Sequence, residues 1–324
     1  RIPWMIFPIQ VAPRTAENHC SVVANEWTSG MSVEAASQSG ESGQAAAFEF
    51  VRSLSVELSG GRVELPSFPD VAVRVRRALA DEGSTVEQVV RIVGSEPALA
   101  ARLLKMANSA LLNRSGKQVT DLRTAVNRMG HNMVRSAAIS FAMAQIRAAS
   151  KLKGLESFLE DLWESSTQVA AMSFVLASRL TKLNPDEAML AGLLHGIGKL
   201  YIVTRAEKHP ILFMQPEAMH DMIRDWHAAI GKAILENWEF SESMAEAIAS
   251  QDDLARETED PPNLTDVIAA ALLISSFATD PKGLEAAMQG SPVIDRLRLN
   301  GEKSAEIMRE SANEIASLRS ALKG

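Results

Sequence analysis

Apolar side chains recur every three or four positions along most of this chain, which is the spacing of one face of an α-helix. Two successive runs show the pattern: Val71, Val75 and Leu79, then Val86, Val89 and Val93. No stretch alternates apolar and polar residues as a half-buried strand does. The pattern therefore predicts an all-α protein built as a bundle of many helices.

Cap residues predict where several of these helices begin. Thr85 stands before Glu87 and Gln88 in the arrangement of a capping box, and Pro97 falls in the first turn of the next helix. Asn184 precedes a proline at the start of another helix. Further helices are expected over 124–130 and 132–146, joined by Gly130, and over 155–180, 223–238, 243–250 and 264–277.

Composition and chain breaks divide the sequence into three predicted segments. Residues 1–43 are rich in Ser, Ala, Gln and Gly without a sustained period, which is typical of a leader or linker. Residues 44–280 form the predicted helical domain, beginning with a helix over 44–58. Residues 281–324 form a C-terminal helical extension with one apolar stripe: Met308, Ala312, Ile315, Leu318 and Leu322. We expect this stripe to dock on the domain, and pairing with a second copy in a homodimer is the alternative.

Bulk composition restricts the classes of function. The single cysteine, Cys20, excludes an internal disulfide and fits a reducing, cytoplasmic setting. No apolar run reaches the roughly 18 residues of a membrane helix. The net charge of −7 argues against nucleic acid as a partner, although residues 70–153 hold 14 Lys and Arg against 6 Asp and Glu. We expect those basic side chains to lie on solvated helix faces, and an acidic partner or a phosphorylated ligand is the alternative.

Two groups of motifs occur in a fixed order. The first comprises Leu65-Pro66-Ser67-Phe68-Pro69, Ser95-Glu96-Pro97-Ala98-Leu99-Ala100, Asn108-Ser109 and the stretch from Ala125 to Gly130. The second is Ala191-Gly-Leu-Leu-His-Gly-Ile-Gly-Lys199. In order and spacing they resemble the HDOD domains, relatives of the HD phosphohydrolases, and the resemblance covers roughly residues 55–280. It implies an HD-domain-like helical bundle.

The resemblance also locates a metal site whose ligands are partly replaced. HD phosphohydrolases hold divalent metals with histidines and aspartates, and the metal activates a water and binds phosphate oxygens. The corresponding positions in this chain are Ser165, His195, Gly196, His227, Gln251 and Asp252. Serine replaces the first histidine, glycine replaces the aspartate of the central His-Asp pair, and glutamine and aspartate stand where two histidines often occur. We therefore expect no bound metal and no cofactor, because two imidazoles without a nearby carboxylate bind hard metal ions poorly.

The surviving histidines have two interpretations. His195 lies among leucines and is expected to be a buried histidine with one hydrogen bond. His227 is expected to be similar, or partly exposed because it follows Asp225 and Trp226. Alternatively, His195, His227 and Lys199 line a pocket for a small phosphorylated ligand. Lys199 shares the helical face of His195 if the helix continues, although a surface lysine is the simpler interpretation.

The sequence is therefore consistent with three hypotheses of function. The resemblance implies a non-catalytic, bacterial signal-transduction module that works through contacts with other signalling proteins or by binding a ligand without hydrolysing it. A residual metal-dependent phosphohydrolase is the second hypothesis, and it needs replacement ligands such as Asp221, Asp252 or Asp253. A nucleic-acid-binding regulator that uses the basic stretch 74–153 is the third, although no aromatic platform is interleaved with those charges.

Overall fold

The computed structural model describes residues 49–50, 52–53, 56, 70–81, 83–109, 112–113, 116–149, 156–206 and 216–323. These residues form helices and their connections with no β-strand among them, which confirms the predicted all-α fold. None of their helices is both long and apolar enough to cross a membrane. The predicted leader, Cys20, most of the predicted helix over 44–58 and the entry at 65–69 lie outside the described residues.

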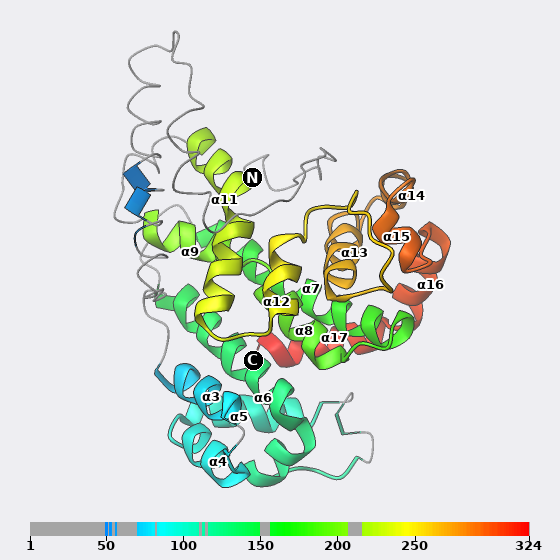
Figure 1. The fold of residues 1–324 in the computed structure, drawn as a ribbon. Helices are drawn as coiled ribbons and strands as arrows, with labels where there is room; N and C mark the ends of the chain where they lie inside the picture. The colour runs from blue at the N-terminus through cyan, green and yellow to red at the C-terminus, as the bar shows by residue number, and fades with distance from the viewer. Residues whose placement is uncertain are drawn as a thin grey trace.

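The first part of the fold is a small helical lobe, which lies at the bottom of Figure 1 in blue and cyan. This N-terminal lobe comprises α3 (Asp70–Ala80), α4 (Val86–Gly94), α5 (Pro97–Ala107) and residues 122–129 of α6 (Leu122–Ala149). The predicted capping box of α4 is present, since the Gln88 backbone N–H donates to the Thr85 side chain and the Thr85 N–H donates to Gln88 Oε1. Gly130, with φ 70°, kinks α6 and sends its second part toward the remaining helices.

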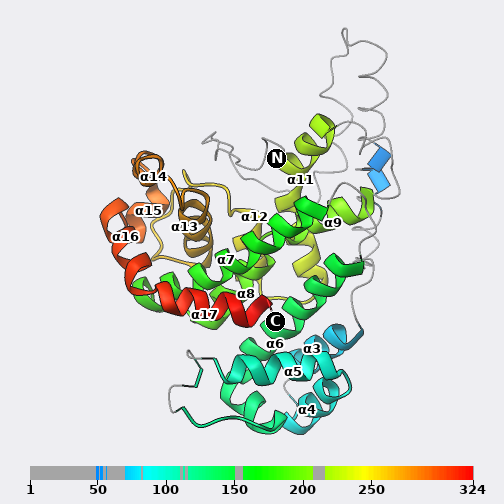
Figure 2. The same cartoon turned by 180° about the vertical axis from the view of Figure 1, so that it is seen from behind.

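The remaining helices form the main body, which is defined here as residues 156–323. Its central helices are α7 (Glu156–Leu180), α8 (Pro185–Leu194), α9 (Ile197–Ala206), α11 (Pro216–Asn237), α12 (Glu242–Ala249) and α13 (Leu264–Ser276). The long helix α7 packs along α8 and against α13, while α11 packs against α9 and α12. Figures 1 and 2 show this group above the N-terminal lobe. Val169, Met172 and Leu176 are buried on the inward face of α7, as the sequence predicts.

The C-terminal segment contains more helices than the sequence predicts. It comprises α14 (Pro281–Met288), α15 (Pro292–Arg296), α16 (Gly301–Glu310) and α17 (Ala312–Lys323). The single stripe expected over 302–322 is wrong, because the helix breaks at Ser311 and leaves Ala312 exposed. Ile315, Leu318 and Leu322 are nevertheless buried, and α17 packs on α7, α5 and α6. The stripe therefore docks on the domain through its second half.

Polar contacts hold α17 against both parts of the molecule. From α5, the buried Arg102 donates hydrogen bonds to the Lys323 carbonyl oxygen (2.9 Å) and to Ser140 Oγ (2.8 Å). The Ser140 hydroxyl in turn donates to the carbonyl of Leu322. A cation beside the last carbonyls of a helix is favourable, because those groups carry partial negative charge. Glu164 of α7 pairs with Arg319 (2.9 Å) and also with Lys323.

A buried ion triad fixes the connection between α12 and α13. Asp266 has no exposed side-chain surface, and its Oδ1 accepts hydrogen bonds from Arg256 Nη2 (2.5 Å) and Arg296 Nη2 (2.6 Å). Burial raises the pKa of the Asp266 carboxyl, but these guanidinium groups outweigh burial and hold that pKa below its ordinary value. The triad positions the connecting segment, which carries two of the predicted site residues.

The prediction for the basic stretch is only partly right. Arg74 and Arg77 lie on the exposed face of α3, as expected. Arg102 is buried, however, and Arg76 and Arg135 are half-buried. These three side chains turn toward aromatic rings, because a guanidinium keeps favourable contacts on a ring face when it leaves water.

Candidate functional site

The predicted site centres on the turn between α8 and α9. The condition for His195 and Lys199 to share a helical face is not met, since α8 ends at Leu194 and α9 begins at Ile197. His195 and Gly196 form the break and are buried. His195 Nδ1 lies 2.8 Å from the carbonyl oxygen of Gly192, which can only accept, so Nδ1 carries the proton and Nε2 keeps its lone pair.

A close helix crossing sets His227 opposite this turn. A Cβ atom added at Gly198 of α9 would lie 1.9 Å from the backbone oxygen of His227 in α11, so only glycine permits this approach. The His227 side chain is buried, with the whole residue 6% exposed, which rules out the partly exposed alternative. Its Nε2 lies 3.1 Å from Asp252 Oδ2, and its buried Nδ1 has no hydrogen-bond partner among the described residues.

The segment after α12 completes the group. Gln251 is buried, and its Nε2 donates a hydrogen bond to the backbone oxygen of His195 (3.1 Å). Asp252 contacts His227 while 54% of its own side chain stays exposed, so it forms the solvent-facing edge of the site. Of the other proposed replacement ligands, Asp221 is exposed and paired with Arg224 (2.7 Å), and Asp253 is exposed.

Electrostatics keep both imidazoles neutral at pH 7. Burial, with a further contribution from the charge of Lys199, lowers the pKa of His195 to about 4. Burial also lowers the pKa of His227, and its hydrogen bond with Asp252 opposes that shift only in part. Burial raises the pKa of Asp252, but His227 and Lys199 outweigh it and lower that pKa overall. Lys199 is thus close enough to His195, His227 and Asp252 to interact with all three.

The structure does not bring Ser165 to this group. Ser165 is exposed on α7, whereas the next residue, Ser166, is fully buried and has no hydrogen-bond partner for its Oγ among the described residues. A Cβ atom added at Gly196 would lie 3.5 Å from Ser166 Oγ. The apolar stripe of α7 carries the missed signal, because Ser166 follows Leu162 by four residues and precedes Val169 by three.

The residues present do not fit a catalytic metal. Gly196 offers no ligand, and the space for a side chain there is occupied, since an added Cβ would lie 2.6 Å from Leu162 Cδ1. Asp252 already occupies the Nε2 side of His227. In the part of the chain that the structure describes, no group of three or more His, Cys, Asp or Glu side chains is placed to hold a metal ion.

Comparison with known proteins identifies the family. The model of the HDOD domain matches residues 65–254, which is more than half of the chain. The protein belongs to the HDOD family. A solved structure from Shewanella amazonensis SB2B, named "Putative metal-dependent phosphohydrolase", is similar to this HDOD chain with 28% identity and a TM-score of 0.69. The similarity covers 86% of this chain and 99% of that one.

Two further proteins are similar to this chain at lower identity. An HDOD domain protein of unknown function from Geobacter sulfurreducens is 22% identical over 87% of this chain and 97% of its own, with a TM-score of 0.59, and shares the fold. An uncharacterised protein of Treponema pallidum (strain Nichols) is 22% identical over 228 residues, which are 66% of this chain. The HDOD chain spans 42% of the length of that curated relative.

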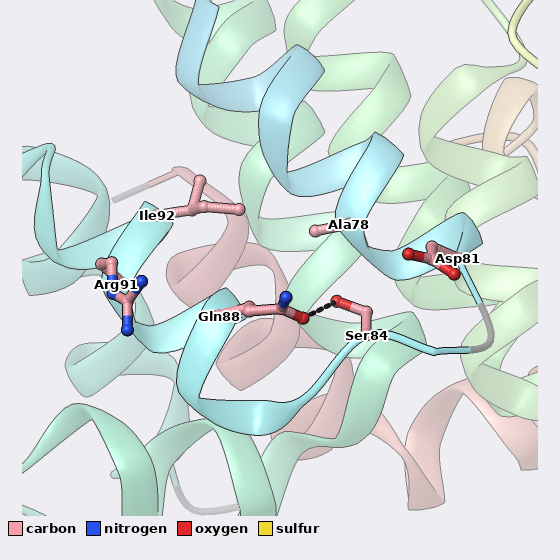
Figure 3. Close-up of a pocket in the computed structure, with 6 residues that line it drawn as sticks. All are labelled: Ala78, Asp81, Ser84, Gln88, Arg91 and Ile92. Carbon is pink, nitrogen blue, oxygen red and sulfur yellow. Dashed lines mark hydrogen bonds between the residues drawn. The ribbon is translucent and has the colours of Figure 1, made fainter.

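A surface hollow lies elsewhere, on the N-terminal lobe. It has a volume of about 230 Å³ and is lined by Ala78, Asp81, Ser84, Gln88, Arg91 and Ile92 of α3, α4 and their connection (Figure 3). Gln88 is already engaged, since it accepts from Ser84 Oγ (3.2 Å) and from the Thr85 backbone N–H. The hollow shares no residue with the His195 group and does not extend the candidate site.

Proposed function

We propose that this HDOD chain is a non-catalytic, cytoplasmic regulatory module of bacterial signal transduction. It acts through contacts with other signalling proteins or by binding a small phosphorylated ligand without hydrolysing it. The observation that carries the proposal is the geometry at Gly196. The position that supplies a metal-binding aspartate in the related hydrolases has no side chain here, and Leu162 occupies the space that a side chain would need.

The remaining polar groups suit binding better than turnover. His195 and His227 are neutral hydrogen-bonding groups, and the basic group beside them is Lys199, whose pKa is lowered by burial and supported by the charge of Asp252. Such a set recognises a phosphate through hydrogen bonds and charge. It lacks the paired metal ligands that would activate a water for attack on that phosphate.

A residual phosphohydrolase is the competing proposal, favoured by the contact between Asp252 and His227 and by the name of the Shewanella amazonensis relative. Metal analysis and turnover of a phosphodiester such as bis(p-nitrophenyl) phosphate separate the two. We expect substoichiometric Fe, Mn and Zn in the purified chain, and no turnover above that of the His195→Ala, His227→Ala double variant. Stoichiometric metal together with turnover that the double variant loses would overturn the non-catalytic proposal.

A further inference from the structure

Two half-buried arginines face the turn that links α11 to α12. Arg76 of α3 places its guanidinium carbon 5.4 Å from the ring centroid of Trp238. Arg135 of α6 lies in the same way over Phe240, at 5.8 Å. The two rings are themselves neighbours, with centroids 6.4 Å apart. Two positive charges from the N-terminal lobe and α6 thus converge on one aromatic pair of the main body.

Neither arginine forms an ion pair with a residue that the structure describes. Arg76 makes no hydrogen bond and no ion pair with any described residue, and its Nη1 is buried. Arg135 donates one hydrogen bond, from Nη2 to the backbone oxygen of Leu79 (3.0 Å), while its Nε is buried without a partner among the described residues. The acidic neighbours Glu239 and Glu187 influence the two charges from a distance but form no ion pair with them.

This arrangement differs from that of Arg102, Arg256 and Arg296. Arg256 and Arg296 share the carboxylate of Asp266, and Arg102 donates to two oxygen atoms. Burial is the largest cause of the lowered pKa of both Arg76 and Arg135, and for Arg76 the charge of Arg77 and, less strongly, that of Arg135 add to the lowering. Partly desolvated like charges without an anion are unfavourable, so an anion bound between them would stabilise the site.

The backbone of the turn also carries strain. Glu239, between the two rings, has φ 58°, a left-handed conformation that helix ends usually give to glycine. The Phe240 N–H closes the turn by donating to the Leu235 oxygen (3.0 Å). A strained residue that holds two aromatic side chains in place is a recurrent feature of binding sites.

We propose that Arg76 and Arg135, stacked on Trp238 and Phe240, bind a phosphate-bearing anion at the junction between the N-terminal lobe and the main body. The rings lie against the faces of the guanidinium groups, and the ligand would bind the N–H groups that have no partner among the described residues, which include Arg76 Nη1 and Arg135 Nε. The planar edges of guanidinium groups match the spacing of phosphate oxygens, which they bind in pairs. The proposal goes beyond the function above, because it needs neither His195 nor His227.

Phosphate titration of the full chain tests the proposal. The probes are inorganic phosphate and adenosine monophosphate, each followed by calorimetry at constant ionic strength with chloride as the balancing anion. Arg76→Gln is the key variant, because it removes the guanidinium group without breaking a hydrogen bond to any described residue. Arg77→Gln is the matched control, since Arg77 is the exposed neighbour on the same helix and carries the same charge.

We expect saturable binding that Arg76→Gln weakens by at least about tenfold, as for loss of a charged hydrogen bond, while Arg77→Gln leaves it unchanged. The affinity of Arg76→Lys, which keeps the positive charge and loses the planar guanidinium, should lie between those of Arg76→Gln and Arg77→Gln. Tighter binding of adenosine monophosphate than of phosphate identifies an ester as the ligand, and equal binding identifies the free anion. No saturable binding, or equal weakening by Arg76→Gln and Arg77→Gln, would overturn the proposal. The phosphate titration does not depend on metal content or turnover, so its failure would leave the proposed function untouched.

Discussion

The crowding at Gly196 can be tested by adding a single methyl group. The backbone of Gly196 lies outside the left-handed region, so alanine is compatible with it and would by itself stabilise the fold by about 0.4–1 kcal/mol. The new Cβ would lie 2.6 Å from Leu162 Cδ1, however, a contact that forces Leu162 to move. Overpacking of this kind costs about 1–3 kcal/mol. We therefore expect Gly196→Ala to destabilise the protein by about 1–2 kcal/mol.

A double-mutant cycle with Leu162→Ala isolates the contact. Leu162 is buried, so its truncation alone costs about 2–5 kcal/mol and removes the atom that meets the new Cβ. In that background Gly196→Ala should stabilise by about 0.4–1 kcal/mol, which gives an interaction energy of about 1–3 kcal/mol. Urea unfolding followed by circular dichroism supplies the four free energies. Equal effects of Gly196→Ala in both backgrounds would refute the account of this position.

The surroundings of Gly196, His195 and Asp266 support three further predictions. Rebuilding a metal site needs Gly196→Asp and Ser166→His, together with a smaller side chain at Leu162 to make room for the aspartate. Calorimetry should detect Mn²⁺ binding to this variant. It should detect none when Ser165→His replaces Ser166→His. Unfolding free energy should fall by up to about 3 kcal/mol as the pH drops from about 6.5 to about 4, because the unfolded chain protonates His195 and the folded chain does not. Asp266→Ala should cost about 3–5 kcal/mol in urea unfolding, because it leaves two arginines inside without their anion.

Each of these has its own control. For the pH dependence, His195→Gln removes the buried imidazole, and a variant with an unchanged loss of stability between those pH values would show that other groups cause it. For the ion triad, Asp260→Ala removes an exposed carboxylate close by in sequence and should stay within about 0.5 kcal/mol of the parent protein. An Asp266→Ala variant as stable as Asp260→Ala would contradict the triad's role.

The sequence predicts most of the helices because local signals define them. Thr85, Pro97 and Asn184 begin helices where their side chains suggest, and Gly130 kinks α6. The break at Ser311 escaped prediction because the apolar spacing of the segment runs through it without interruption. The helix after the break, α17, packs against α7, and tertiary packing can override the local helix propensity of a segment.

The part of the candidate site that the sequence predicts is likewise the part that local motifs mark. Motif order points to His195, His227 and Asp252, and the structure brings these three near one another. Motif position points to Ser165, although helical phase favours Ser166. The inward turn of Arg76 depends on Trp238, a residue far along the chain, so no local pattern reveals it.

The hydrogen bond from Arg102 to the Lys323 carbonyl bears on how the protein is made. The two residues are 221 positions apart, so the N-terminal lobe leaves the ribosome long before its partner exists. Until α17 arrives, the Arg102 guanidinium has the Ser140 hydroxyl but lacks the Lys323 carbonyl as an acceptor, and the surface that α17 covers stays open. Completion of the packing around these early-made helices therefore depends on the synthesis of α17, which contacts both α5 and α6.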